Sequence, residues 1–308
     1  MQLANTNSKK NKLNSLIKIL RFIWSHPLAS KNRGKAFWNF FAWQLTQQIM
    51  HKPVLCQLVE DSVLLAEKGM AGATGNIYTG LLEFDDMAFV LHALRPDDLF
   101  ADIGANIGVY SVLAAKNAGA SVIAVEPIPS TSVHLKNNIY LNKITQQVTH
   151  LQVGVGNENG TLAFTNTMDS INHVVPNHDG KDEGVIEIQV KKLDDIFADQ
   201  LPAIMKMDIE GYEWPALNGA KNMLASQNLK AIIIELNGCG NAFGFSDDAI
   251  HELLLANDFK PYSYNAFNRS FSLLPHYGHH NTIYSKDLNW AMQRVAAAKK
   301  YSILNRQV

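Results

Sequence analysis

The chain has few cysteines and no long apolar run. Two cysteines, Cys56 and Cys239, occur in 308 residues, and neither belongs to a pair with metal-ligand spacing. This rules out a disulfide framework, and we expect two reduced, buried thiols. No stretch reaches about 18 consecutive apolar residues, so the sequence predicts no membrane-spanning helix. A secretory signal is not expected either, because Lys18 and Arg21 interrupt the apolar run near the start.

Acidic residues are absent from the N-terminal part. No Asp or Glu precedes Glu60, whereas nine Lys and Arg do, which leaves 18 basic and 28 acidic residues in the remainder. The net charge of -1 and pI of about 6.8 argue against a nucleic-acid binder that works through overall charge. A basic segment joined to an acidic body is typical of a contact with an anionic partner.

The basic segment also has a helical pattern. Residues 13–24 place apolar side chains at helical spacing with Lys18 and Arg21 on the other side, and an aromatic-rich stretch follows at 37–43. Two interpretations remain open: a helical extension packed on the main domain, or a basic amphipathic helix resting on an anionic membrane surface. We expect residues 1–74 to form this extension. We also expect a cytoplasmic protein, peripheral at the inner face of the membrane if the second interpretation holds.

From about residue 98, short apolar runs alternate with helical stretches. The predicted strands are 99–103, 122–125, 148–153, 204–207 and 231–236, and the predicted helices are 109–117, 130–141, 214–224 and 247–256. This alternation implies right-handed crossovers and a mostly parallel sheet covered on both faces, which is a doubly wound α/β fold. Residues 154–195 break the rhythm with strand-like runs at 161–164 and 185–190. We interpret them as an insertion over the cofactor edge of the sheet.

The first chemically informative segment is the turn after residues 99–103, which reads Asp102-Ile-Gly104-Ala-Asn106-Ile-Gly108. Gly104 permits a sharp turn, and Gly108 permits close approach of helix and ligand. In open α/β sheets, ligands bind at the carboxyl ends of the strands. The spacing lacks the three glycines of a pyrophosphate-binding turn. An acidic Asp102 instead favours S-adenosylmethionine (SAM), which carries an ammonium and a sulfonium.

The second segment is the strand end that finishes in Glu126 and Pro127. Glu126 lies 24 residues beyond Asp102. A carboxylate at this place can accept both hydroxyls of a ribose. Paired with the Asp102 turn, it predicts a ligand of the adenosine type.

The third segment, Lys206-Met-Asp208-Ile-Glu210-Gly-Tyr-Glu213, places three carboxylates at another strand tip. In one interpretation, Glu210 and Glu213 only favour the N-terminus of the next helix. In the other, Asp208 and Glu210 orient the SAM amino group or the acceptor hydroxyl. They could also hold Mg²⁺, although a complete ligand set for a metal is not visible.

Together these segments resemble the FkbM family of SAM-dependent methyltransferases. The similarity covers roughly residues 75–285. Its motifs are DIGANIG, VEPIP, LDD at 193–195, KMDIEGYE, IIIELN, Asn-Ile-Tyr-x-Gly at 76–80 with Glu83 after it, and Asn-Thr-Ile-Tyr at 281–284. The resemblance implies a class I, Rossmann-like methyltransferase domain at 75–290 with a mostly parallel seven-stranded sheet. A C-terminal helical tail at 291–308 would follow.

The resemblance also implies roles for individual residues. The cofactor-binding candidates are Asp102, Gly104, Asn106, Gly108, Glu126, Pro127, Tyr78 and Glu83. Asp208 and Glu210 would lie in the reaction centre. Family members mostly methylate hydroxyls on sugars, glycans or secondary metabolites, so we expect SAM-dependent O-methylation of a hydroxyl-bearing substrate and no nucleic-acid partner.

A hydroxyl acceptor needs a base or a metal to remove or polarise its proton. The candidates are Asp208 and His173, which the insertion could carry over the site. His276, His279 and His280 have spacing that could bind a metal, but a polar loop explains them equally well. Two other functions remain open: an NAD(P)-dependent Rossmann oxidoreductase and a non-catalytic, membrane-associated adaptor. The missing third glycine weighs against the first, and the intact acidic residues weigh against the second.

Overall fold

The computed structural model describes residues 2–308 except 51, 68, 166–172, 176–183 and 279, with side chains described from residue 14 onward apart from that of Ala71. Its central sheet contains β3 (Leu99–Ile103), β4 (Ser121–Val125), β5 (Val148–Leu151), β9 (Ile204–Met207), β10 (Ala231–Glu235), β11 (Lys260–Asn265), β12 (Ser270–Leu273) and β13 (Asn281–Ser285). The strand order is β12-β11-β13-β10-β9-β3-β4-β5. The five strands from β10 to β5 are parallel. Strand β13 is antiparallel to both of its neighbours.

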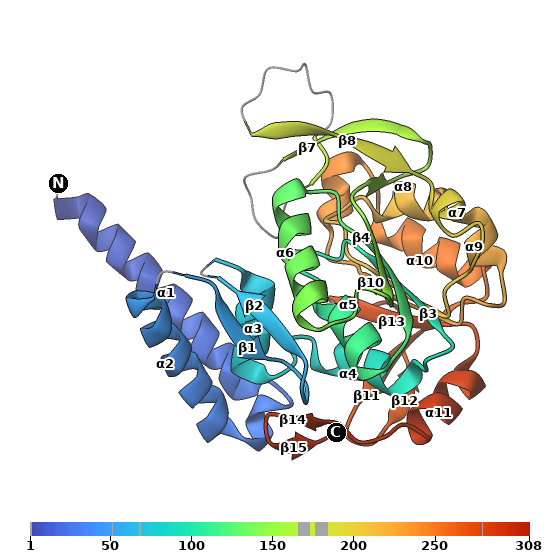
Figure 1. Ribbon diagram of the computed structural model, residues 1–308. Helices are drawn as coiled ribbons and strands as arrows, with labels where there is room; N and C mark the ends of the chain where they lie inside the picture. The colour runs from blue at the N-terminus through green and yellow to red at the C-terminus, as the bar shows by residue number, and fades with distance from the viewer. Residues whose placement is uncertain (1, 51, 68, 166–172, 176–183, 279) are drawn as a thin grey trace.

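Helices cover both faces of this sheet (Figure 1). One face carries α4 (Phe84–Ala93), α5 (Val109–Val112) with the π-helical turn η2 (Leu113–Asn117), α6 (Pro129–Leu141) and α11 (Leu288–Ala296). The other carries α8 (Glu213–Asn218), α9 (Lys221–Ala225) and α10 (Asp247–Ala256). This confirms the doubly wound α/β fold. The chain winds from β3 to β4 and β5 in one direction and returns through β9 and β10 in the other, so the switch point lies between β3 and β9.

The sheet has one strand more than the seven that were expected. The additional strand, β12, pairs only with β11 among the described strands and forms the sheet edge. The hairpin that β11 and β12 form is stabilised by an aromatic cluster, in which the ring centroids of Tyr264 and Phe271 lie 4.9 Å apart. Such cross-strand aromatic contacts stabilise a strand that has a neighbour on one side alone.

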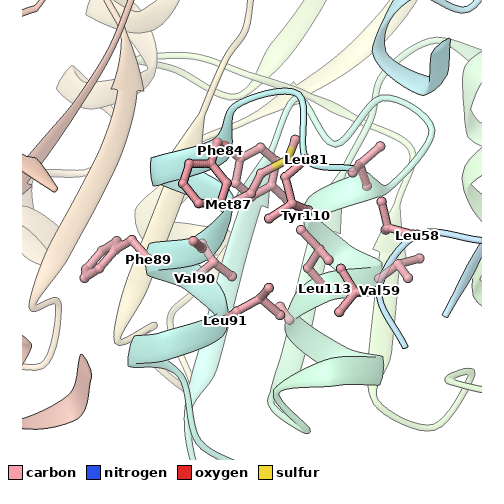
Figure 2. Close-up of a cluster of buried hydrophobic side chains, with 14 of the residues drawn as sticks. Leu58, Val59, Leu81, Phe84, Met87, Phe89, Val90, Leu91, Tyr110 and Leu113 are labelled. Atoms are coloured by element: carbon pink, nitrogen blue, oxygen red, sulfur yellow. The ribbon is translucent and has the colours of Figure 1, made fainter. Parts of the chain in front are cut away.

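The core on the α4 face includes residues from distant parts of the sequence. Figure 2 shows Leu58 and Val59 of the N-terminal segment beside Leu91 of α4 and Leu113 of η2. Val59 and Leu113 are fully buried. Because these side chains leave water together, the N-terminal segment and the sheet domain share one hydrophobic core.

The N-terminal 74 residues are less uniformly helical than expected. Helix α1 (Gln2–Ser25), the 3₁₀ turn η1 (Ala29–Lys31) and α2 (Arg33–Ile49) precede a hairpin of β1 (Val54–Gln57) and β2 (Val63–Ala66), and α3 (Ala71–Thr79) follows. The side chains of Asn138 on α6 and of Asn142, which caps the end of α6, accept hydrogen bonds from the backbone N–H groups of Leu65 and Val63, respectively. The hairpin therefore forms where α6 satisfies the free edge of β2. No helix in the described part of the chain is both long enough and apolar enough to cross a membrane.

The segment that interrupts the strand and helix alternation forms a small sheet of its own. It consists of β6 (Gly154–Val155), β7 (Gly160–Thr165) and β8 (Val185–Lys191) in the order β6-β8-β7, and α7 (Leu193–Ile196) follows. Residues 166–172 and 176–183 of the expected insertion lie outside the described residues. The small sheet lies above α6 in Figure 1, apart from the central sheet, and its side chains pack on Ile128, the residue that precedes α6.

The expected helical tail at 291–308 is wrong beyond Ala296. The chain continues into a hairpin of β14 (Ser302–Ile303) and β15 (Arg306–Gln307). Its turn residues, Leu304 and Asn305, both have positive φ angles, as a type I′ hairpin turn requires. Tyr301, which precedes β14, is buried and donates a hydrogen bond from its hydroxyl to the backbone oxygen of Leu91, 3.1 Å away. Ile303 is buried as well, so alternate side chains of this segment lie in the core. This alternation favours a strand over a helix.

Candidate functional site

A cavity of about 290 Å³ lies at the carboxyl ends of β3, β4, β9 and β10. Residues at the ends of these strands or directly after them line it, including Gly104, Glu126, Asp208 and Glu235. Its volume is near the lower end of the range for ligand pockets, about 300–1,000 Å³. The cavity therefore occupies the switch point, where ligands bind in open α/β sheets.

The turn after β3 closes the floor of this cavity. Gly104, Asn106 and Gly108 have φ angles of 78°, 50° and 86°. The backbone N–H groups of Gly104 and Ala105 both donate to the oxygen of Val125, at 3.0 and 2.9 Å. A Cβ atom on Gly104 would lie 1.9 Å from the backbone oxygen of Asp208. Glycine is therefore required here by the backbone conformation and by the close approach of the β9 strand end.

Substitution of Gly104 by Ala is expected to destabilise the protein by about 2–5 kcal/mol. The left-handed conformation costs about 1–2 kcal/mol for a residue with a Cβ, and the clash with Asp208 adds an overpacking cost. Urea denaturation monitored by circular dichroism measures the change. The matched control is Gly34→Ala, because a Cβ at Gly34 meets no atom within 4 Å. Equal stability of the two variants would contradict the assignment.

Glu126 is held rigidly at the end of β4. Its Oε2 accepts a hydrogen bond from the backbone N–H of Asn106, and its Oε1 accepts one from that of Ile128, each at 2.9 Å. Burial raises the pKa of Glu126 to about 7, although both hydrogen bonds oppose the shift. A carboxylate has about four acceptor sites, so two remain for a ligand.

Asp102 lies inside the sheet end and is also hydrogen-bonded. The hydroxyl of Ser111 donates to its Oδ2 at 2.5 Å. Burial raises the pKa of Asp102 to about 6, while the Ser111 hydrogen bond and the Lys206 charge oppose the shift. Asp102 therefore joins β3 to α5 and contributes negative charge to the cavity wall.

A buried lysine lies among the acidic side chains of the cavity. Lys206 of β9 is 2% exposed, and its Nζ lies 3.2 Å from Oδ2 of Asp208 and 3.3 Å from Oδ1 of Asn281. Burial alone would lower the pKa of Lys206, but the charges of Asp208 and Glu83 together raise it above its ordinary value. Lys206 is therefore a permanent cation at the site.

Asp208 forms a close carboxyl pair with Glu235 at the end of β10. The two carboxyl groups are within hydrogen-bonding reach of each other, which requires a shared proton. Burial disfavours ionisation of Asp208, but Lys206 outweighs it and lowers the pKa of Asp208. Burial, and next the charge of Asp208, raise the pKa of Glu235. Asp208 is thus the ionised member of the pair, and Glu235 holds the proton.

Further acidic groups extend this centre toward α4 and α8. The hydroxyl of Tyr110 donates to Oε2 of Glu83 at 2.6 Å. Burial, and next the charge of Glu83, raise the pKa of Asp86 to about 7. Glu210 lines the cavity with φ 56°, and burial followed by the charge of Asp208 raises its pKa. Such a positive φ is uncommon for a residue other than glycine and is often found at functional sites.

Glu213 has a structural position in this segment. Its Oε1 accepts hydrogen bonds from the backbone N–H groups of Ile209 and Gly211, at 3.1 and 3.2 Å. The side chain therefore stabilises the turn between β9 and α8 through its backbone N–H groups. It does not belong to the residues that line the cavity.

Most of the site residues expected from the sequence come together here. The cavity is lined by Glu83, Asp102, Gly104, Asn106, Glu126, Pro127, Asp208 and Glu210. Gly108 does not line it: a Cβ there would meet Leu135 at 2.3 Å, so Gly108 allows α5 to pack on α6.

Two other expected residues lie outside the cavity lining. Tyr78 packs its ring against Phe40 and accepts a hydrogen bond from Gln44, because its face of α3 is turned toward α2. His173 lies beside the site, where its charge lowers the pKa of Glu210, opposing the burial effect. The preceding residues 169–172 lie outside the described part of the chain.

Lys206, Glu235 and Tyr110 also belong to the site, although the sequence patterns predicted no role for them. The signal for Lys206 was a lysine inside an otherwise apolar strand, and for Glu235 an acid at the end of an apolar run. Both positions mark strand ends at the ligand-binding edge of the sheet. Tyr110 gave no signal, because its hydroxyl reaches Glu83 only after α4 and α5 pack together.

The acidic centre does not fit the expected Mg²⁺ site. Among the described residues, no group of three or more His, Cys, Asp or Glu side chains is arranged to hold a metal ion. The Lys206 ammonium already compensates Asp208 and would face a divalent cation placed there. His276 lies 3.5 Å from Asp248, and His279 is outside the described residues, so the histidine cluster carries no metal assignment.

A family model and one characterised relative show what the chain is similar to. A family model described as the methyltransferase FkbM domain matches residues 102–261, more than half of the chain. The hexuronic acid methyltransferase AglP of Haloferax volcanii is 28% identical over 158 residues, which are 50% of this chain and 62% of that protein. The chain therefore spans less than two thirds of the length of this relative.

Two solved structures illustrate how distant the structural relatives are. The methyltransferase FkbM from Methylobacillus flagellatus KT is 17% identical with a TM-score of 0.43, over 85% of this chain and 60% of that chain. The precorrin-6y C5,15-methyltransferase from Geobacter metallireducens GS-15 is 12% identical with a TM-score of 0.40, over 72% of this chain and 93% of that chain.

Proposed function

The chain belongs to the FkbM methyltransferase family, and on this premise we propose that it uses SAM to methylate a hydroxyl group on a sugar-containing acceptor. The observation that carries the proposal is the charge of the cavity. Six carboxyl groups line it, from Glu83, Asp102, Glu126, Asp208, Glu210 and Glu235. Lys206 is the single cationic side chain among the described residues that line it.

This charge favours SAM over a dinucleotide. The ammonium and sulfonium of SAM would be stabilised by the carboxylates, whereas the pyrophosphate of NAD(P) would be repelled by them. The two open acceptor sites of Glu126 suit the ribose hydroxyls. An NAD(P)-dependent oxidoreductase therefore has less support than a methyltransferase.

Bound in the cavity, SAM would supply the methyl group from its positively charged sulfonium. Glu126 would hold the ribose, with Pro127 and the backbone around Asn106 forming the adjoining wall. Asp102 and Gly104 would keep this wall in position through the turn after β3. Much of the rate would come from orienting the acceptor beside the methyl group.

The Asp208–Glu235 pair supplies a route for the acceptor proton. A general base works best when its pKa lies near the operating pH. Glu235, with its raised pKa, meets that condition better than Asp208, which Lys206 keeps ionised. Asp208 would then orient the hydroxyl. Glu235, after the pair has lost its shared proton to solvent, would accept the hydroxyl proton as the methyl group is transferred. Glu210 and His173 stand beside this pair as further positioning candidates.

The similarity to AglP supports the proposed acceptor class. AglP is a hexuronic acid methyltransferase, and the matching region includes half of this chain. A sugar hydroxyl is a poor nucleophile while it keeps its proton, so a base at the acceptor position is consistent with this class. We propose O-methylation of a sugar or glycan on this ground.

The experiment that tests the cofactor is calorimetric titration of SAM and S-adenosylhomocysteine into the protein and into Glu126→Gln. We expect Glu126→Gln to weaken binding about 10- to 100-fold, because a hydrogen bond to a charged group is worth about 1.5–3 kcal/mol. The amide would also place an NH₂ group against the N–H of Asn106 or Ile128.

The matched control is Glu252→Gln, because Glu252 is exposed on α10 and does not line the cavity. Its affinity for SAM should equal that of the unchanged protein. Tight binding of NAD(H) with none of SAM would overturn the proposal and favour the oxidoreductase. Binding of neither ligand would favour a non-catalytic adaptor.

A further inference from the structure

Helix α2 has two apolar faces, and only one of them is used by the fold. Its buried residues are Ala36, Phe40, Trp43 and Gln47. On the opposite side lie Trp38, Phe41, Leu45 and Ile49, which are 68, 60, 59 and 69% exposed. At about 100° per residue, the second set is centred half a turn away from the first. We call Trp38, Phe41, Leu45 and Ile49 the outer stripe.

The outer stripe is not explained by packing within the chain. Single exposed apolar residues are common on protein surfaces, but a continuous row over three helical turns marks an interaction site. The row extends toward the end of α1, where Trp24 is 57% exposed and its ring lies 6.4 Å from that of Phe37. In Figure 1, α1 and α2 project from the side of the sheet domain.

The N-terminal helices that present the outer stripe carry positive charge. Among the described side chains of α1, η1 and α2, the exposed cations are Lys18, Arg21, Lys31, Arg33 and Lys35. The Arg33 guanidinium lies 4.2 Å from the centre of the Trp24 ring. No Asp or Glu occurs before Glu60, so no acid of this segment neutralises them. The partner must therefore be apolar at the stripe and anionic beside it.

We propose that the outer stripe binds the surface of an anionic lipid membrane. Its apolar side chains would enter the boundary between headgroups and acyl chains, and the neighbouring Lys and Arg would contact lipid phosphates. Tryptophan is enriched at this depth of a bilayer, which suits Trp24 and Trp38. A second copy of the chain fits less well, because two basic surfaces would face each other across the interface.

The position of α2 connects this surface to the cavity. Asn39 of α2 donates a hydrogen bond to the backbone oxygen of Ile77 on α3, at 3.0 Å. Two other residues of α3, Gly72 and Asn76, line the cavity. A membrane bound at the outer stripe would thus lie one helix away from the proposed methyl-transfer site.

The test is co-sedimentation of the full chain with vesicles of phosphatidylcholine alone and of phosphatidylcholine mixed with phosphatidylglycerol. We expect binding to the anionic vesicles, weaker binding to the neutral ones, and release by high salt. The variant Trp38→Ser/Leu45→Ser should lower the partition coefficient about tenfold or more, which corresponds to about 1.4 kcal/mol.

The matched control is Tyr140→Ser/Leu273→Ser, which removes two side chains that are 75 and 64% exposed elsewhere on the surface. It should bind vesicles like the unchanged chain. Thermal melting followed by circular dichroism checks that both variants fold. If the stripe variant fails to fold, Lys18→Glu/Lys35→Glu tests the same surface through its charge and should also lose binding to anionic vesicles.

Three results would overturn the proposal. In the first, the unchanged chain does not bind anionic vesicles. In the second, the stripe variant binds them as well as the control variant does. In the third, the unchanged chain is a dimer, and the stripe variant is a monomer that still binds vesicles. The last result, measured by size-exclusion chromatography with light scattering, would assign the stripe to self-association. SAM titration of the stripe variant should give unchanged affinity, which separates this proposal from the proposed function.

Discussion

Replacing Asp208 with Asn is expected to lower kcat about 10²- to 10⁴-fold, the usual contribution of general acid–base catalysis, while SAM still binds. Asp208 lies at the end of β9 between Lys206 and Glu235. Without its charge, Glu235 would ionise beside Lys206 and lose the raised pKa that makes it a suitable base. Labelled methyl transfer from SAM to a glycan containing hexuronic acid measures the change, and calorimetry measures SAM binding.

The pH dependence of turnover should identify the base. Burial, and next the negative charge of Asp208, raise the pKa of Glu235. The proton-free pair is the active form, so turnover should rise with pH through the raised pKa of the pair and fall below it. In Glu235→Gln this limb of the profile should disappear along with most of the activity.

Asp199→Asn is the control for these variants, since Asp199 is exposed and does not line the cavity. Its turnover should match the unchanged protein. Near-full turnover of both Asp208→Asn and Glu235→Gln would remove the pair from the mechanism and leave His173 as the candidate base. A normal melting temperature for each variant is required before turnover is compared.

The parts of the fold that were predictable are those set by local pattern. Strands β3 and β9 have the bounds that their apolar runs predicted, because a strand buried on both faces is a short continuous apolar run. The helix expected at 214–224 is divided into α8 and α9 instead. At the break, a Cβ on Gly219 would lie 2.1 Å from the backbone oxygen of Gly156, a contact that exists only after β6 packs nearby.

The sequence predicted which acidic residues at strand ends line the candidate site. It did not predict how their charges interact. Asp102, Glu126 and Asp208 each follow an apolar run, and strand ends of a parallel sheet meet at one edge. Their protonation states depend on Lys206 and Glu235, which approach Asp208 from different positions in the folded sheet. The spacing of these residues in the sequence does not show how close they lie in the fold. The structure was therefore needed to show that Asp208 is ionised and that Glu235 is protonated.

Lys206→Met is expected to destabilise the protein by about 3–5 kcal/mol at neutral pH, the cost of breaking a buried ion pair by removing one partner. The ammonium is almost fully buried and interacts with Asp208, Asn281 and Glu83. Methionine fills a similar volume but leaves the carboxylates without a counter-charge. Urea denaturation of the ligand-free protein measures the loss.

Two further variants distinguish this cause from a simple packing defect. Lys206→Met/Asp208→Asn removes the uncompensated charge and should recover part of the stability. Lys230→Met removes a lysine whose ion pair with Asp287 is partly exposed, so its cost should stay within about 1 kcal/mol. Equal losses in Lys206→Met and Lys230→Met would show that burial of the first pair has no special cost.

The pH dependence of this loss has a definite sign. In the unchanged protein the raised pKa of Lys206 stabilises the fold below the unfolded lysine pKa, and the lowered pKa of Asp208 stabilises it above the unfolded aspartate pKa. The pair therefore contributes a constant stability across the neutral range.

In Lys206→Met, the pKa of Asp208 should rise above its unfolded value. A carboxyl group with a raised pKa destabilises the folded state at pH values above the unfolded-state pKa. This destabilisation disappears as the pH falls below the raised pKa, because the group then takes up a proton. The deficit of Lys206→Met should thus shrink as the solution is acidified from about pH 8 to about pH 5, whereas a packing defect would leave it unchanged.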